Sequence, residues 1–266
     1  MPQASVNGMS INYSDSGGDG LPVLLIHAFP LHGGMWEPQV EALSDRFRFI
    51  AVDLKGFGGS DAPDDRSQYS VDSSADELAA VLDEAGVTKA VICGLSMGGY
   101  IAFALLRRHR DRVAGLVLAD TRAEADPPEG VAKRTSQQEL VEKEGIGALS
   151  DGLINALLAE PTREKKPDVV QRVRELMDNP AAGYIGALEA LKTRPDSTDD
   201  LVGISVPTLI IVGENDALTP VDFSRKMHER IGGSRLVVIP EAGHLSNLEA
   251  PEAFNGALAE FLAEID

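Results

Sequence analysis

Short apolar runs alternate with helical patterns at both ends of the chain. Runs with the length and composition of buried strands occupy residues 23–27, 47–53, 90–93, 113–119, 207–213 and 235–239. Helical spacing of apolar positions occurs at residues 71–85, 221–230 and 251–263. Strands that alternate with helices at short intervals predict an α/β fold, with a mostly parallel central sheet flanked by helices.

The alternation changes at two places. Residues 5–13 alternate around Asn7 and Gly8, which predicts a β-hairpin with a tight turn. Residues from about 121 to 200 show helical stretches and prolines but no clear strand. We therefore predict a core formed by residues 1–120 and 201–266, with a helical cap over residues 121–200. Because open α/β sheets bind ligands at the carboxyl ends of their strands, we expect the cap there.

Composition and charge narrow the choice of partners. Hydrophobic content of 43% and charged content of 25% are ordinary for a globular protein, and no apolar run is long enough to span a membrane. The N-terminus lacks a signal-peptide pattern and the single cysteine, Cys93, cannot form an internal disulfide, so we expect a cytoplasmic protein. We interpret Cys93 itself as a buried core residue. A net charge of −18 opposes binding to nucleic acid and to anionic membranes, and mildly disfavours anionic substrates.

The chemistry centres on Gly94-Leu95-Ser96-Met97-Gly98, a G-x-S-x-G sequence between a strand-like run and a helical one. That context predicts a sharp turn on which the serine takes a strained backbone and lifts its hydroxyl into solvent. The Met97 N–H, at the start of the helix, is unpaired and available to a developing negative charge. The turn therefore predicts a nucleophile, Ser96, and half of an oxyanion hole.

A serine hydroxyl needs a base to remove its proton, and the base needs an acceptor to fix its tautomer. His244 follows the last predicted strand, which places it at the same rim as Ser96 and makes it the candidate base. The remaining histidines are expected in other roles, at the surface for His109 and His228 and in backbone organisation for His27 and His32.

The candidate acid is Asp216, which follows the strand run 207–213 and lies between Ser96 and His244 in the chain order expected for this turn. Asp120 is the main alternative, because it ends the run 113–119 and could also reach the histidine; its structural interpretation is a loop or helix cap. Glu214 is the third candidate.

The second oxyanion donor is expected in the loop after residues 23–27. The Phe29 N–H is the candidate, because Pro30 has none. The alternative is that this segment is an ordinary apolar loop. Trp36, the only tryptophan, is interpreted as a core residue outside the catalytic set.

Several segments follow the motif order of one family. Residues 27–30 are similar to H-G-x-P, with Ala28 in place of the glycine, and residues 53–61 are similar to D-x-x-G-x-G-x-S-[DE]. Together with the turn at 94–98 and the loops that contain Asp216 and His244, they resemble the α/β-hydrolase superfamily over nearly the whole chain. Within it, residues 94–99 and 244–249 look most like carboxylesterases and 3-oxoadipate enol-lactonases.

The resemblance implies the α/β-hydrolase fold with a helical cap, and hydrolysis of carboxylic esters of small substrates through an acyl-enzyme. Serine at position 96 argues against haloalkane dehalogenases and epoxide hydrolases, which use aspartate there. The reaction needs neither a metal nor an organic cofactor.

Other activities stay open. Enol-lactone hydrolysis uses the same groups, but its substrate carries carboxylates and would need a cation such as Arg122, Arg134 or Arg194. The net charge favours a neutral ester over that lactone. Perhydrolase, cofactor-free haloperoxidase or carbon–carbon hydrolase activity is also compatible, as is a ligand receptor that keeps the catalytic residues without turnover.

Overall fold

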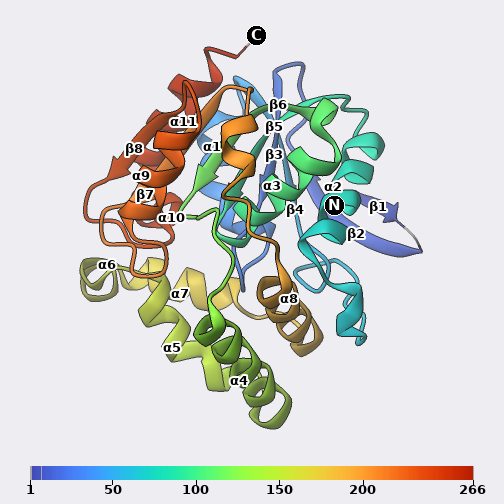
Figure 1. Cartoon of the computed structure of the whole chain (residues 1–266), viewed down its shortest axis with the longest axis vertical. Coiled ribbons are helices and arrows are strands. Elements are labelled where there is room, and N and C mark those ends of the chain that lie inside the picture. Colours follow the sequence, from blue (N-terminus) through green and yellow to red (C-terminus); the bar gives the residue numbers. More distant parts are fainter. Residues whose placement is uncertain (1, 7, 266) are drawn as a thin grey trace.

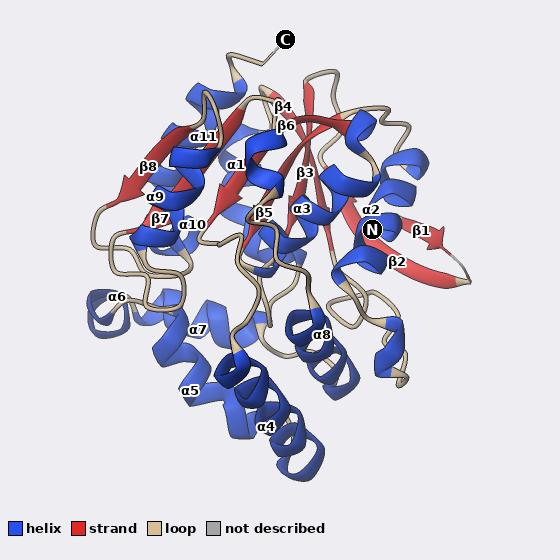
Figure 2. Ribbon diagram, in the orientation of Figure 1, coloured by secondary structure: helices blue, strands red, loops and turns tan. Residues whose placement is uncertain are grey.

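The computed structural model describes residues 2–6 and 8–265, and within them an eight-stranded sheet runs through the centre of the molecule (Figures 1 and 2). Its strands are β1 (Gln3–Val6), β2 (Met9–Asp15), β3 (Leu21–Ile26), β4 (Phe47–Val52), β5 (Ala90–Leu95), β6 (Val113–Ala119), β7 (Thr208–Gly213) and β8 (Arg235–Ile239). The order in the sheet is β1-β2-β4-β3-β5-β6-β7-β8. All pairs from β4 to β8 are parallel, so the predicted mostly parallel sheet is confirmed.

The antiparallel part of the sheet is at its N-terminal edge. β1 and β2 form the predicted hairpin, in which Val6 pairs with Met9, and β2 then pairs with β4. The predicted tight turn includes Asn7, which lies outside the described residues.

Helices cover both faces of the sheet. In the core these are α1 (Glu37–Leu43), α2 (Val71–Glu84), α3 (Met97–Arg108), α9 (Val221–Arg230), α10 (Ser246–Glu249) and α11 (Pro251–Leu262), with short 3₁₀ helices η1 (Gly33–Trp36), η2 (Arg66–Gln68), η3 (Arg110–Arg112) and η4 (Asp200–Gly203). Within the sheet, the chain moves from β3 to β4 in one direction and from β5 to β6 in the other. Because both connections are right-handed crossovers, their helices α1 and α3 lie on opposite faces of the sheet. Helix α2 packs on α3, and α1 packs on α11.

A segment of helices separates β6 from β7. It contains α4 (Pro128–Glu144), α5 (Gly147–Leu157), α6 (Glu160–Lys165), α7 (Pro167–Leu176) and α8 (Ala181–Thr193), and no strand occurs in this fully described segment. Pro128 and Pro167 begin α4 and α7, where a missing N–H costs nothing. Figures 1 and 2 show these helices beyond one edge of the sheet. The arrangement supports the predicted helical cap, whose limits at 121 and 200 stay a prediction.

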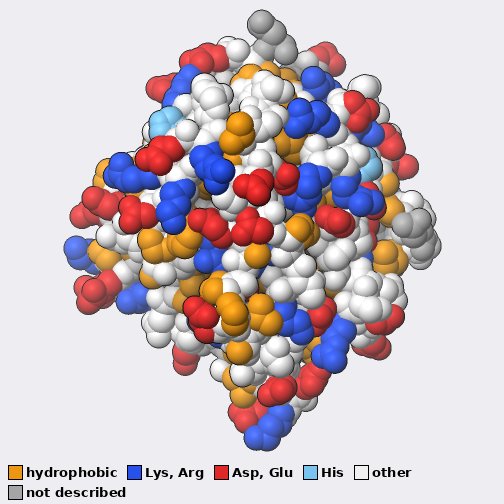
Figure 3. Space-filling view, in the orientation of Figure 1, with side chains coloured by type: hydrophobic (Ala, Val, Ile, Leu, Met, Phe, Trp, Pro, Cys, Tyr) orange, Lys and Arg blue, Asp and Glu red, His pale blue; other side chains and the backbone are white. Residues whose placement is uncertain are grey.

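The surface is mixed in charge. On the face in Figure 3, acidic and basic side chains are interspersed, and hydrophobic side chains gather near the junction between the sheet-containing part and the helices of the cap. In the described residues we find no helix with the length and hydrophobicity needed to cross a bilayer. Cys93 is fully buried on β5, as predicted.

A buried ion pair anchors the loop that follows β4. Lys55 Nζ lies 2.5 Å from Glu77 Oε1 on α2, and the two side chains are only 2% and 6% exposed. Burial raises the pKa of Glu77, and the charge and hydrogen bond of Lys55 oppose that rise. Lys55 also lies over the ring of Tyr69, on which Gly186 of α8 packs so closely that a Cβ would collide with it. The Lys55–Glu77 ion pair therefore lies next to the contact between Tyr69 of the core and α8 of the cap.

We expect Lys55→Met to destabilise the protein by about 3–5 kcal/mol, because Glu77 would remain as a buried charge without its cation. The free energy of unfolding from urea titration measures this loss. The double variant Lys55→Met/Glu77→Leu removes both charges and should recover most of the stability. A single variant as stable as the double one would contradict the expectation.

Candidate active site

The register of the parallel strands brings two loops to one point. Ile26 at the end of β3 pairs with Gly94 near the end of β5, so the loop after β3 and the turn after β5 begin at the same level. The strand order reverses between these two strands, which is where open α/β sheets form a crevice. Phe29 and Ser96 follow these strand ends.

The turn after β5 has the strained geometry that its sequence predicts. Ser96 has φ 55° and ψ −111°, a conformation that L-residues rarely adopt. A Cβ at Gly94 would collide with the Gly98 carbonyl, and one at Gly98 would collide with the Ile26 carbonyl. The Ser96 N–H donates to the Ala119 oxygen at 2.9 Å, which holds the turn against β6. Only glycine at both flanking positions permits this close packing.

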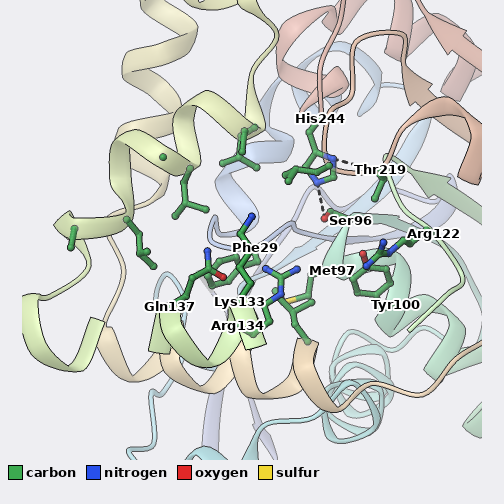
Figure 4. A pocket seen from close by; sticks show the side chains of 18 residues that line it. Phe29, Ser96, Met97, Tyr100, Arg122, Lys133, Arg134, Gln137, Thr219 and His244 are labelled. Atoms are coloured by element: carbon green, nitrogen blue, oxygen red, sulfur yellow. Dashed lines mark hydrogen bonds between the residues drawn. The ribbon is translucent and has the colours of Figure 1, made fainter. Parts of the chain in front are cut away.

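Ser96, His244 and Asp216 converge although they lie far apart in the chain. His244 Nε2 is 2.8 Å from Ser96 Oγ, a contact drawn in Figure 4. On the other side of the ring, His244 Nδ1 is 2.9 Å from Asp216 Oδ2. The three residues come from the loops after β5, β7 and β8, at the carboxyl edge of the sheet. Of the five histidines, all within the described residues, only His244 lines the same pocket as Ser96. This geometry is the one that a nucleophile, a base and an orienting acid require.

Asp216 is held by its own loop. Its Oδ1 accepts hydrogen bonds from the N–H groups of Leu218 at 2.8 Å and Thr219 at 2.9 Å, and its Oδ2 accepts one from Thr219 Oγ1 at 2.6 Å. Thr219 Oγ1 also lies 3.3 Å from His244 Nδ1. Sequence reasoning missed Thr219; its position three residues after an aspartate and directly before Pro220 is the signal that was available.

Burial and charge act in opposite directions on this pair. Burial alone would raise the pKa of Asp216, but the charge and hydrogen bond of His244, together with the hydrogen bonds of Thr219, hold it below its ordinary value. Burial lowers the pKa of His244, whereas the charge and hydrogen bond of Asp216 outweigh burial and raise it above the ordinary 6.5. An ionised Asp216 therefore makes the imidazole a stronger base and fixes Nδ1–H.

The two alternative acids occupy other positions. Asp120 is fully buried, and it accepts hydrogen bonds from the Gly213 N–H at 2.8 Å and Ser246 Oγ at 2.5 Å rather than from His244. Burial and the nearby charge of Asp216 raise the pKa of Asp120 well above its ordinary value. Glu214 is exposed and accepts from a backbone N–H at 3.1 Å. The geometry therefore favours Asp216 as the partner of the imidazole.

The two predicted oxyanion donors lie beside the serine. Phe29 and Met97 both line the pocket that contains Ser96 (Figure 4). Neither of their backbone N–H groups donates to another group in the part of the chain that the structure describes. Unpaired amides at this position are available to a negative oxygen formed at Ser96.

His27 organises the loop that carries Phe29. Its Nε2 accepts the Leu54 N–H at 3.0 Å, so its Nδ1–H donates to the Ala28 oxygen at 2.9 Å. Burial lowers the pKa of His27 to about 4, which keeps the ring neutral in this role. The expected backbone-organising function of His27 agrees with these contacts, and Trp36 is fully buried away from the pocket.

The pocket has a volume of about 270 Å³, and the cap supplies much of its wall. Helix α5 contributes apolar side chains, among them Leu149, Leu153 and Leu157. Helix α4 contributes Lys133, Arg134 and Gln137, which lie together on its side of the pocket (Figure 4). The predicted position of the helical segment over the carboxyl edge therefore fits the structure, whereas the polar residues of α4 were not singled out by the sequence, apart from Arg134.

Asp126 gathers the arginines that the sequence proposed as substrate cations. Its carboxylate lies 2.5 Å from Arg122, 3.2 Å from Arg134 and 2.9 Å from Arg194. Arg122 and Arg134 line the pocket, but Arg194 is buried over the Tyr100 ring and does not. The expectation that Arg194 could meet a substrate is therefore wrong, because tertiary packing directs its guanidinium to Asp126.

No group of three or more histidine, cysteine, aspartate or glutamate side chains within residues 2–6 and 8–265 is arranged to hold a metal ion.

Comparison with known proteins agrees with this geometry. The model of the α/β hydrolase fold family matches residues 22–251. The 3-oxoadipate enol-lactonase 1 of Acinetobacter baylyi is 30% identical over 260 residues, which cover 97% of this chain and 95% of that protein.

Two solved structures are similar over almost their whole length. A malate-bound thermophilic esterase from Thermogutta terrifontis has a TM-score of 0.93 and 40% identity, covering 99% of this chain and 98% of that one. The enol-lactonase from Burkholderia xenovorans LB400 has a TM-score of 0.91 and 31% identity, covering 99% of this chain and 100% of that one. With its sheet, its cap and the family match in agreement, the chain belongs to the α/β-hydrolase fold family, among hydrolases related to esterases and enol-lactonases.

Proposed function

We propose that this protein hydrolyses carboxylic esters of small substrates through an acyl-enzyme. The observation that carries the proposal is the bridging imidazole, with His244 2.8 Å from the Ser96 hydroxyl and 2.9 Å from the Asp216 carboxylate. The similarity to the esterase from Thermogutta terrifontis supports the same reaction class.

Each group has a defined role in the proposed mechanism. Ser96 Oγ attacks the ester carbonyl while His244 Nε2 accepts its proton, and Asp216 stabilises the imidazolium that forms. The Phe29 and Met97 amides donate hydrogen bonds to the oxyanion. His244 then protonates the leaving alcohol, and a water molecule, deprotonated by the same imidazole, releases the acid and restores Ser96.

A second candidate is an ester or lactone that carries a carboxylate. Lys133 lines the pocket, and no acidic side chain lies within ion-pair distance of it in the described part of the chain. Arg122 Nε and Gln137 Oε1, also in the pocket wall, are buried without a described hydrogen-bond partner. The Lys133 ammonium and the Arg122 Nε–H are donors and could bind an anion despite the net charge of −18, whereas Gln137 Oε1 can only accept a hydrogen bond. The enol-lactonase relatives, and the malate in the esterase structure, support this candidate.

Turnover of short p-nitrophenyl esters tests the proposal directly. We expect release of p-nitrophenol, and a phosphonate ester should add covalently to Ser96, as mass spectrometry of the labelled peptide would show. A protein with saturable ligand binding but no turnover and no adduct would instead be a receptor. Peroxide-dependent or carbon–carbon cleavage without ester hydrolysis would point to the other predicted activities.

Substitutions should separate the acid candidates. Ser96→Ala should lower kcat by about four decades or more, because no acyl-enzyme can form. Asp216→Asn should lower kcat by fewer decades, since the imidazole loses its orienting charge. Asp120→Asn should change kcat little. Steady-state kinetics with circular dichroism as a folding control measure these effects. A larger loss in Asp120→Asn than in Asp216→Asn would transfer the acid role to Asp120.

Activity should fall as pH decreases through the pKa of His244, because a protonated imidazole cannot accept the serine proton. Since that pKa is raised, the midpoint of the acid limb in kcat/KM should lie above 6.5. Asp216→Asn, which removes the charge that raises the pKa, should move the limb to lower pH. A rate that stays constant from about pH 5 to 8 would contradict the role of His244.

Lys133→Gln tests the anionic substrate. The KM of this variant for a p-nitrophenyl hemiester of a dicarboxylic acid should rise about 2- to 5-fold, the range expected for one exposed charge pair. Its KM for a neutral ester of the same length should stay unchanged. Lys143→Gln is the matched control, because Lys143 is on the same helix and is likewise exposed, but lies outside the pocket. Equal effects on both esters would remove Lys133 from substrate binding.

A further inference from the structure

A buried carboxylate holds the loop that carries His244. Glu249, at the end of α10, is 1% exposed. Its Oε1 accepts hydrogen bonds from the N–H groups of Gly243 at 3.0 Å and Leu245 at 3.3 Å, the residues on either side of His244. The carboxylate therefore fixes the backbone from which the imidazole projects.

The same carboxylate reaches the cap. Glu249 Oε2 accepts the Ala159 N–H at 2.9 Å, between α5 and α6. Two further bonds join the same segments: the His244 N–H donates to the Leu157 oxygen at 3.1 Å, and Lys166 Nζ donates to the Glu249 carbonyl at 2.6 Å. The histidine loop and the C-terminal end of α5 are thus parts of one hydrogen-bonded unit.

Helix α5 is also a wall of the substrate pocket. Leu149, Leu153 and Leu157 line it, and Leu157 is the residue whose carbonyl oxygen accepts the His244 N–H. A substrate that packs against α5 therefore contacts the helix that Glu249 connects to the loop of His244.

Resting on the proposed function, we propose that Glu249 is a positioning residue that couples the pocket wall formed by α5 to the imidazole of His244. An acyl chain that fills the pocket against α5 then places the base more accurately for proton transfer than a short chain does. Misplacement of a catalytic group by a fraction of an ångström is enough to lower the rate of such a step.

Glu249 also contributes to the electrostatics of the imidazole. The groups that face His244 are the carboxylates of Asp216, Asp120 and Glu249, the hydroxyls of Ser96 and Thr219, and the Leu157 carbonyl from the cap. Among the described residues, no cationic side chain lies within ion-pair distance of the Glu249 carboxylate. Its negative charge adds to that of Asp216 in raising the pKa of His244 against the effect of burial.

The test compares Glu249→Gln with Glu249→Asp on p-nitrophenyl acetate, butyrate and hexanoate. Glu249→Gln should lower kcat about tenfold or more with a smaller change in KM, because bonds to a charged acceptor are lost. The loss should be larger for butyrate and hexanoate than for acetate, and the acid limb should move to lower pH. Glu249→Asp keeps the negative charge, but its shorter side chain does not reach the Ala159 N–H. This variant should therefore lose the advantage that longer acyl chains have in the wild type, while its acid limb stays at the wild-type pH.

Glu77→Gln is the control, because Glu77 is likewise a buried carboxylate but lies outside the pocket. It should lower the melting temperature without changing the chain-length profile or the acid limb. If Glu249→Gln behaves in the same way, Glu249 has a structural role only and the proposal is wrong.

NMR titration of the His244 imidazole separates this proposal from the proposed function. A lower His244 pKa in Glu249→Gln, together with a wild-type protein that hydrolyses no ester, would support the coupling and overturn ester hydrolysis. An unchanged His244 pKa and unchanged chain-length profile, in an active wild type, would overturn the coupling alone.

Discussion

The close approach of two backbone segments is the constraint on which the site depends. Gly98 packs on the Ile26 carbonyl and Gly94 on the Gly98 carbonyl, with no room for a Cβ at either glycine. This contact brings α3 against β3 and β5 at the point where the strand order reverses. The strained backbone of Ser96 is stable only because the packed strands on both sides hold it.

The imidazole of His244 lies among three buried carboxylates, each of which has different hydrogen-bond partners. Asp216 faces Nδ1 and stays ionised through its bonds to the ring and to Thr219. Asp120 sits behind this pair, where burial and the neighbouring charge favour its neutral form. Glu249 is bound by three backbone amides instead of a cation. Of these three carboxylates, only that of Asp216 makes a direct hydrogen bond to the ring, so burial and contacts, not residue type, distinguish these acids.

The pocket reverses the overall charge of the chain locally. Although the net charge is −18, Arg122, Lys133 and Arg134 line the space beside Ser96. Asp126 balances part of this charge and also binds Arg194 at the far end of the cap segment. A count of charges over the sequence therefore says little about the field that a bound substrate meets, because local pairs dominate at short distance.

Residues whose roles depend on local backbone could be predicted from the sequence. The turn at Ser96 is specified by its two glycines and by the strand and helix patterns beside it, and Asp216 and His244 follow strand runs whose carboxyl ends must share one edge. The short helices α1 and α10 were not predicted, because a helix of so few residues shows too little hydrophobic periodicity to be recognised in the sequence.

Contacts between distant segments were decided only by the tertiary structure. Three contacts join segments that are far apart in the chain: the hydrogen bond from His244 to Asp216, the bond from Glu249 to the cap and the ion pair of Arg194 with Asp126. Chain order favoured Asp216 over Asp120, but chain order and hydrophobic period contain no distances between side chains. The contacts themselves were therefore decided only when the strands and the cap packed together.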